Sequence, residues 1–291
     1  MTIRPRRSVL YMPGSNARAI EKAKTLPVDA VILDLEDSVA PDAKETARKQ
    51  VMEAVKAGGF DGREVMVRIN AIDTPWGGDD LTAAVAAAPD IILVPKVSTR
   101  QPVEAIGQRL LDMHADLRTR LWVMIETPLA ILNIAAIAAC AADSETRLSG
   151  FVMGTNDLAK DTRARLVPGR FPMIPWLMNC IAAARIYGID VLDGVYNNIG
   201  DAEGFVKECE QGRDMGFDGK TLIHPNQIEP CNKVFTPSDD EVKWARTMIA
   251  AFDLPENKSK GVVSIDGKMV ERLHADLARR TVAVADAIAA R

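Results

Sequence analysis

The strongest constraint on the fold of this chain is a regular alternation of short apolar runs with longer segments of helical periodicity. Runs that are apolar at consecutive positions are typical of strands covered on both faces. We predict such strands at Ser8–Met12, Ala30–Leu35, Glu64–Ile69, Ile91–Pro95, Leu121–Ile125, Gly150–Met153, Asp190–Leu192 and Gly219–Ile223. We predict helices at Asn16–Leu26, Ala43–Ala57, Asp80–Ala88, Pro102–His114, Pro128–Ala141, Ile174–Tyr187, Ala202–Met215 and Pro225–Phe235. Eight strand–helix units are the number that closes a parallel sheet, so the predicted fold class is α/β, a TIM (β/α)8 barrel.

The chain continues beyond the last predicted strand–helix unit, and this C-terminal part is not needed to complete a barrel. In it we predict a helix that ends at Phe252, an extended piece with a turn at Gly261–Gly267 and an amphipathic helix at Met269–Ala290. The predicted domains are therefore a catalytic barrel over residues 1–235 and an extension over residues 236–291, which packs on a barrel or covers it as a lid.

Composition and charge exclude several classes of protein. The 36 basic and 40 acidic residues give a formal charge of −4, which argues against a broad basic surface and a nucleic-acid partner. No apolar run is long enough to span a membrane or to form a secretory signal, and the four cysteines have no CxxC spacing. We therefore expect a cytoplasmic protein with reduced thiols, no membrane partner and no zinc site. No G-x-G-x-x-G motif follows the first strand, which disfavours dinucleotide binding.

Ionisable side chains recur at the predicted carboxyl ends of the strands, where barrel enzymes build their active sites. Carboxylates without clustered histidine or cysteine suit Mg²⁺, with Mn²⁺ as the alternative. Glu126 and Asp157 follow the fifth and sixth strands, and neighbouring strands lie about 4.8 Å apart. We therefore predict that these two side chains share one divalent cation. Gly154 and Pro225 lie at the same rim, and we expect both to contribute to substrate binding together with Glu126.

A cationic side chain joins this rim from the third strand. Arg68 and Asn70 alternate onto one side of that strand, so the guanidinium is placed to bind a substrate carboxylate through two hydrogen bonds. A metal and an arginine together would chelate and orient a 2-oxo acid. We expect at least one carboxylate after the second strand to brace this arginine; the three are Asp34, Glu36 and Asp37. Asp37 is also a candidate catalytic residue.

Two further rim residues each have a structural and a catalytic interpretation. Lys96 follows the fourth strand, where a lysine can form a Schiff base, but we favour an ion pair with the acidic rim. His224 follows the eighth strand, and we interpret it as orienting its loop rather than acting as a base.

Three basic residues lie on or near the first predicted helix: Arg18, Lys22 and Lys24. Such charges commonly form a solvated face. Their position just after Gly14, close to a helix N-terminus at the rim, also suits a phosphate group. We predict that they anchor a nucleotide-bearing thioester such as coenzyme A.

Several stretches, which together cover nearly the whole chain in order, carry a resemblance to a known family. They are RSVLYMPGSNARAIEKAKTLPVDAVILDLEDSVAPDAKETAR, VRIN, ILVPKV, MIETPLAI, GTNDLAKD, LVPGRFP, DGVYNNIGDAEGF, GKTLIHPNQI and SIDGKMVERLHADLARRTVAVA. On these stretches the chain resembles the citrate lyase β-subunit-like proteins of the aldolase/citrate lyase superfamily, which include malyl-CoA lyases and β-methylmalyl-CoA lyases.

The resemblance implies a TIM barrel with a C-terminal helical lid, and Mg²⁺-dependent chemistry on 3-hydroxyacyl-CoA thioesters. It implies that Glu126 and Asp157 are the metal ligands, and that Arg68 binds the substrate's carboxylate and polarises its carbonyl. Similar proteins are homo-oligomers, trimers or hexamers, in which the extension of one subunit serves as a lid on a neighbour's site. Their lid usually presents an aspartate as acid/base where this sequence has Glu271, and Asp266 is the other candidate.

Three activities are compatible with this resemblance. The first is a Mg²⁺-dependent lyase that cleaves a malyl-CoA-like 3-hydroxyacyl-CoA to a glyoxylate-type 2-oxo acid and acetyl- or propionyl-CoA, or forms it by Claisen condensation. The second is a (3S)-malyl-CoA thioesterase that hydrolyses malyl-CoA to malate and CoA, an alternative that the departure at Glu271 keeps open. The third is the β subunit of a multi-subunit citrate lyase, against which the complete lid and the predicted CoA anchors count.

Overall fold

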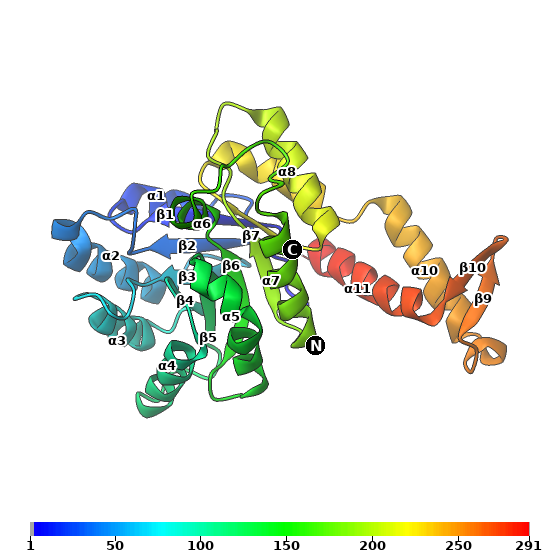
Figure 1. Cartoon of the computed structure of the whole chain (residues 1–291), viewed down its shortest axis with the longest axis horizontal. Helices are drawn as coiled ribbons and strands as arrows, with labels where there is room; N and C mark the ends of the chain where they lie inside the picture. Colours follow the sequence, from blue (N-terminus) through cyan, green and yellow to red (C-terminus); the bar gives the residue numbers. More distant parts are fainter. Residues whose placement is uncertain (1–2, 291) are drawn as a thin grey trace. The chain divides into compact units, whose positions relative to one another are not determined.

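Eight parallel strands form the centre of the larger compact unit of the protein, which spans Arg6–Asn232. The computed structural model describes residues 3–290. Each strand pairs with the next one along the chain and β8 pairs with β1, so the sheet is a closed barrel (Figure 1). The strands are β1 (Ser8–Pro13), β2 (Ala30–Asp34), β3 (Glu64–Arg68), β4 (Ile91–Val94), β5 (Arg120–Ile125), β6 (Leu148–Met153), β7 (Asp190–Asp193) and β8 (Gly219–Leu222). The predicted α/β barrel is confirmed.

Helices connect the parallel strands and lie outside the sheet (Figure 1). They are α1 (Ala17–Ala23), α2 (Lys44–Ala57), α3 (Gly77–Ala87), α4 (Arg100–Asp112), α5 (Pro128–Ala139), α6 (Thr155–Thr162), α7 (Ile174–Ile186), α8 (Ala202–Met215) and α9 (Ile228–Phe235). Helix α6 was not predicted from the sequence, because it is short and mostly polar and buries only Thr155 and Leu158. Among residues 3–290, no helix is both long enough and apolar enough to cross a lipid bilayer.

The barrel interior is filled by apolar side chains, as in other closed barrels of this size. The central cluster consists of Val9, Ala30, Ile32, Met66, Ile91, Leu93, Trp122, Met124, Val152 and Leu192. At the amino-terminal ends of the strands, the Arg6 guanidinium lies 5.0 Å from the centre of the Trp122 ring, and its Nη2 donates to Glu64 over 2.7 Å. Charge and aromatic contacts therefore close that end of the barrel.

Among the described residues, the smaller compact unit comprises residues 3–5 and 233–290. It contains α10 (Asp239–Asp253), β9 (Val262–Ile265), β10 (Lys268–Glu271) and α11 (Arg272–Ala289). Its own apolar core consists of Phe252, Val263, Ile265, Val270 and Ala275.

The start of the last helix at Met269 is a sequence prediction that the structure corrects. Asp266 and Gly267 have φ angles of +49° and +75°, and this left-handed pair makes the tight turn of a β-hairpin. The residues after the turn pair with β9 as strand β10, so the helix begins only at Arg272.

Candidate active site

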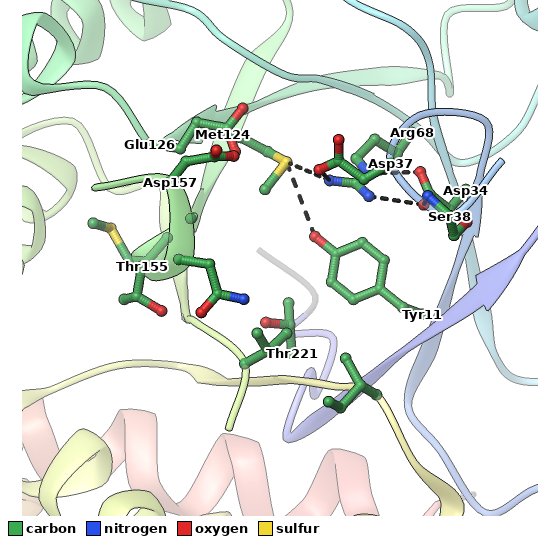
Figure 2. A pocket seen from close by; sticks show the side chains of 15 residues that line it. Tyr11, Asp34, Asp37, Ser38, Arg68, Met124, Glu126, Thr155, Asp157 and Thr221 are labelled. Carbon is green, nitrogen blue, oxygen red and sulfur yellow. Dashed lines mark hydrogen bonds and ion pairs between the residues drawn. The ribbon is translucent and has the colours of Figure 1, made fainter. Parts of the chain in front are cut away.

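A cavity of about 310 Å³ opens at the carboxyl-terminal ends of the barrel strands. This is the end at which barrel enzymes place their chemistry. Five of the predicted site residues line it: Asp37, Arg68, Glu126, Gly154 and Asp157. Figure 2 shows the two carboxylates of Glu126 and Asp157 on one side of the cavity and Arg68 on the other.

Glu126 and Asp157 are brought together by neighbouring strands and by one lysine. Glu126 follows β5 and is 1% exposed, whereas Asp157 lies in the first turn of α6. The Nζ of Lys96 forms an ion pair with Asp157 and lies 3.6 Å from Glu126 Oε1. The backbone N–H of Lys96, a residue with φ of +57°, donates to the same Oε1 over 2.7 Å. The predicted ion pair of Lys96 with the acidic rim is therefore present.

The pKa values of Glu126, Asp157 and Lys96 are shifted by burial and by the opposite charges of their neighbours. Burial raises the pKa of Glu126, although the charge of Lys96 opposes this effect. Burial also acts against ionisation of Asp157, but the hydrogen bond from Lys96 outweighs it and lowers the pKa of that carboxyl. For Lys96 itself, burial is outweighed by the charge of Glu126 and the contacts with Asp157, so its pKa is raised. The carboxylate pair thus requires a positive charge beside it.

Gly154 determines how closely Glu126 can approach the neighbouring strand. Ile125 and Met153 are register partners in β5 and β6, so the residues that follow them are adjacent. A Cβ on Gly154 would lie 2.3 Å from Glu126 Cβ and 2.6 Å from its Oε2, which is closer than real Cβ contacts. A residue without a side chain is therefore required here.

The two carboxylates fit a hard divalent cation such as Mg²⁺. This ion is commonly held by one or two carboxylates and keeps several water or substrate oxygens as further ligands. Within residues 3–290, no cluster of three or more histidine, cysteine, aspartate and glutamate side chains is placed to hold a metal. A cation at Glu126 and Asp157 would therefore leave coordination positions for substrate oxygens.

Arg68 is held by a carboxylate of the neighbouring strand. Asp34 and Arg68 are register partners in β2 and β3, and Nε and Nη2 donate to the two carboxylate oxygens over 2.6 and 2.7 Å. Burial opposes ionisation of Asp34, but this guanidinium holds the pKa of the carboxyl below its usual range. The predicted bracing of Arg68 is present. The two-nitrogen contact predicted for a substrate carboxylate, however, is made on this edge to Asp34, and Nη1 lies toward Asp37 and Met124.

Glu36 is a buried carboxyl beside this arginine. Its Oε2 lies 2.8 Å from Arg68 Nη1 but outside hydrogen-bond geometry, and it has no hydrogen-bond partner among the described residues. Burial raises the pKa of Glu36 to about 8, although the charge of Arg68 opposes the shift. The loop that carries it is fixed by Lys44, whose Nζ donates to the carbonyls of Leu35 and Glu36 over 2.9 and 2.7 Å.

Asn70 does not belong to the cavity lining, contrary to the sequence expectation that it accompanies Arg68. Its amide nitrogen donates to the carbonyl of Leu35 over 2.9 Å and to the carboxylate of Asp80 over 2.6 Å. Asn70 therefore supports the loop after β2 from behind, because the strand has already ended at Arg68 and the inward alternation does not continue.

The three predicted coenzyme A anchors lie on and just after α1. Arg18 and Lys22 are exposed there. Lys24 is more restricted, since its Nζ forms an ion pair with Glu21 at 2.8 Å and lies 5.4 Å from the centre of the Phe60 ring. Their role in binding phosphate stays a prediction.

The remaining predicted residues lie after β8 and in the smaller unit. Pro225 begins a short 3-10 helix (Pro225–Gln227), and the Nδ1 of His224 accepts from the backbone N–H of Asn226 over 3.2 Å, which is the expected loop-orienting role. Glu271 is the N-cap residue of α11. Its backbone N–H donates to His274 Nδ1 over 3.1 Å, and its acid/base role stays a prediction.

Tyr11 and Met124 are among the cavity-lining residues that were not identified as site residues from the sequence. Tyr11 on β1 lies with its ring centre 4.9 Å from Arg68 Cζ, and Met124 on β5 contacts both side chains through its sulfur. The sequence did carry a signal for Tyr11, which is a phenol at an inward-facing position of a largely aliphatic strand. Met124 has the sequence context of an ordinary core residue and carried no such signal.

Comparison with known proteins identifies the family of this chain. The sequence profile of the HpcH/HpaI aldolase/citrate lyase family matches residues 7–225. A relative from Cereibacter sphaeroides, named (3S)-malyl-CoA thioesterase, is 50% identical over 98% of this chain and 96% of its own length. The citrate lyase subunit beta of Escherichia coli K12 is 35% identical over 97% of this chain and 94% of its own length. The structure of the protein CitE from Mycobacterium tuberculosis, solved in complex with magnesium, acetoacetate and coenzyme A, has a TM-score of 0.74 and 27% identity over 97% of this chain and 98% of that one. The chain therefore belongs to the HpcH/HpaI aldolase/citrate lyase family.

Proposed function

We propose that this protein hydrolyses a malyl-CoA-like thioester to malate and coenzyme A with a divalent cation as cofactor. The observation that carries the proposal is one cavity in which Glu126 and Asp157 lie opposite Arg68. The relative named malyl-CoA thioesterase is 50% identical and the one named citrate lyase subunit beta is 35% identical. This difference in similarity supports hydrolysis as the first candidate, ahead of the carbon–carbon cleavage given first among the three activities above.

In this proposal Glu126 and Asp157 hold the cation, for which Mg²⁺ is the candidate because both donors are hard oxygens. The M. tuberculosis relative was solved with magnesium, which supports the same ion. When bound, a divalent cation neutralises the carboxylates and polarises the substrate oxygens that it contacts. Lys96 places one positive charge beside these two carboxylates, so a bound cation would complete the charge compensation.

Hydrolysis adds water to the thioester carbon and then breaks the carbon–sulfur bond. Asp37, whose side chain is 67% exposed at the cavity, is the proposed base that takes a proton from the water and returns it to the departing sulfur. Arg68 Nη1 is the proposed donor to the carbonyl oxygen, on which negative charge develops as the water adds. Asp34 keeps the guanidinium in place for this contact.

Carbon–carbon cleavage is the second candidate, favoured by the citrate lyase relative and by a carboxylate in the C-terminal unit. Here a base removes the hydroxyl proton of the substrate, the bond between the two halves breaks, and glyoxylate leaves. The enolate of acetyl-CoA then takes up a proton, for which Glu271 is the candidate donor. Because that relative is named as a subunit, a role of this chain as one subunit of a larger lyase is a further alternative.

The experiment that tests the proposal is product analysis. The purified protein is incubated with malyl-CoA and Mg²⁺, and the products are quantified by liquid chromatography and mass spectrometry. We expect malate and free CoA in equal amounts, and no hydrolysis of acetyl-CoA, the control thioester that lacks the hydroxy acid. Glyoxylate and acetyl-CoA as the products would establish the lyase instead.

A further inference from the structure

Two hydrogen-bond donors converge on one point of the cavity wall without a strong acceptor between them. Arg68 Nη1 donates to Met124 Sδ over 3.6 Å, and the hydroxyl of Tyr11 donates to the same sulfur over 3.9 Å. Figure 2 shows both contacts at the edge of the cavity. A thioether is only a weak acceptor, and Glu36 Oε2, although 2.8 Å from Nη1, lies outside hydrogen-bond geometry. Both donors can therefore still donate to a better acceptor.

The phenol of Tyr11 is held rigidly in this position. Its ring packs against the central barrel cluster and lies 4.9 Å from Arg68 Cζ, in cation–π contact. Burial raises the pKa of Tyr11 even though the charge of Arg68 opposes the shift, so the hydroxyl keeps its proton at neutral pH. Tyr11 therefore presents a proton to the cavity and not a negative charge.

The partners of Arg68 determine which of its nitrogens can share a ligand with this hydroxyl. Nε and Nη2 are used by Asp34, with donor–acceptor distances of 2.6 and 2.7 Å. Nη1 forms an ion pair with Glu36 and donates its hydrogen bond to Met124. Nη1 and the Tyr11 hydroxyl thus form a pair of donors whose common partner is the thioether.

We propose that Tyr11 is a further catalytic residue, whose hydroxyl donates together with Arg68 Nη1 to one anionic oxygen of the substrate. This inference rests on the proposed function, because it assumes that the substrate is a thioester of a hydroxy acid. The oxygen belongs either to a carboxylate of the bound substrate or to the carbonyl that becomes negative when water adds. In both cases a charged acceptor replaces a weak one.

Energetics support a role in binding over a role in folding. A buried hydroxyl costs free energy unless it is well hydrogen-bonded, and the thioether compensates that cost only weakly. A phenylalanine would fill the same space among the aliphatic side chains. The folded protein alone therefore gains little from the Tyr11 hydroxyl, whereas a bound anion gains a hydrogen bond to it.

The test compares Tyr11→Phe with the matched control Tyr187→Phe, which removes the hydroxyl of an exposed tyrosine after α7. We expect kcat/KM for malyl-CoA hydrolysis to fall by about 10- to 100-fold in Tyr11→Phe, the range for a hydrogen bond to a charged group. The control should stay within about twofold of the wild type, and the Tm of both variants should equal or exceed that of the wild type.

A second readout, calorimetric binding of malate with Mg²⁺ present, separates this inference from the proposed function. Weaker malate binding and a higher KM in Tyr11→Phe identify a carboxylate as the acceptor, whereas a lower kcat with unchanged malate affinity identifies the carbonyl oxygen. If the wild type binds malate without hydrolysing malyl-CoA and Tyr11→Phe binds it more weakly, the proposed function fails and Tyr11 retains its role. Unchanged kcat/KM and malate affinity overturn the inference, as does a loss of activity that accompanies a lower Tm.

Discussion

At the scale of single residues, the cavity is built from charges that compensate one another between neighbouring strands. Asp34 neutralises Arg68 through two hydrogen bonds, and Lys96 places one positive charge beside the two carboxylates of Glu126 and Asp157. Each group is costly to bury alone but stable beside its partner. A change of one side chain therefore acts on its partner as well.

Arg68→Lys should lower kcat/KM for malyl-CoA hydrolysis by about 100-fold or more, the effect of removing one donor to a developing oxyanion. An ammonium group cannot hold Asp34 through two nitrogens and donate to the substrate from a third. Steady-state kinetics measure the effect, with Arg213→Lys on the exposed side of α8 as the control. Equal kinetics for Arg68→Lys and the wild type would show that a point charge suffices.

Glu36→Gln should change the pH dependence of stability. Burial raises the pKa of Glu36 from its ordinary value of 4.5 to about 8, so between these values the folded protein holds a proton that the unfolded chain has released. The stability contribution of this carboxyl is therefore fully present below its unfolded pKa and is lost as the pH rises through the folded one. The amide does not titrate, so the variant should gain free energy of unfolding relative to the wild type by up to about 1.4 kcal/mol per pH unit in this window.

Urea unfolding of the wild type and Glu36→Gln at about pH 5 and about pH 9 measures this difference. The same difference in free energy at both pH values would mean that Glu36 is ionised throughout, despite its burial.

At the scale of elements, the ends of the strands and the turns that follow them determine where the site residues lie. Lys44 and Asn70 fix the loop after β2, and Gly154 allows β6 to turn into α6 directly against Glu126. The buried ammonium of Lys220 in β8 donates to Asp193 at the end of β7 and to the carbonyl of Gly194 just after it, over 2.9 and 2.6 Å. The turns after β2, β6 and β7 are thus positioned by contacts with neighbouring elements.

Gly154→Ala should displace Glu126, because the new Cβ would lie 2.3 Å from the Cβ of that residue. We expect activity and divalent-cation affinity to fall by at least about tenfold, and the free energy of unfolding to fall by about 1–3 kcal/mol, as for other overpacked sites. Gly200→Ala is the control, since its Cβ would come no closer than 3.7 Å to another atom. Wild-type metal affinity in Gly154→Ala would show that Glu126 is not a ligand.

The strand bounds could be predicted to within two residues, since most of the buried strands are short runs of consecutive apolar side chains. The extended piece with its turn at Gly261–Gly267 was predicted, but helix α6 and the second hairpin strand β10 were not. Helix α6 is short and polar, and β10 depends on the left-handed backbone angles of the turn. Asp34 was not predicted as the acceptor of the two-nitrogen contact from Arg68 either, since this contact depends on the register of β2 and β3. The residue types at the rim were visible, but their partners required the fold.

At the scale of the whole molecule, the chain consists of a barrel unit and a smaller C-terminal unit with its own core. The barrel follows from a pattern that repeats along the sequence, and family membership follows from similarity over nearly the whole chain. The lid role of Glu271 and the trimeric or hexameric state remain predictions, because they depend on contacts with a neighbouring copy and not on the local pattern.

The central claim is that Glu126 and Asp157 hold one divalent cation opposite Arg68. Titration with Mn²⁺, followed by the electron paramagnetic resonance signal of the free ion, measures this binding directly in the wild type, Glu126→Gln and Asp157→Asn. Asp161→Asn, an exposed position on the same helix as Asp157, is the control. We predict one Mn²⁺ per chain, displaced by Mg²⁺, in the wild type and the control, and an affinity reduced more than about tenfold in each of the other two variants. Equal stoichiometry and affinity in all four proteins would contradict the account.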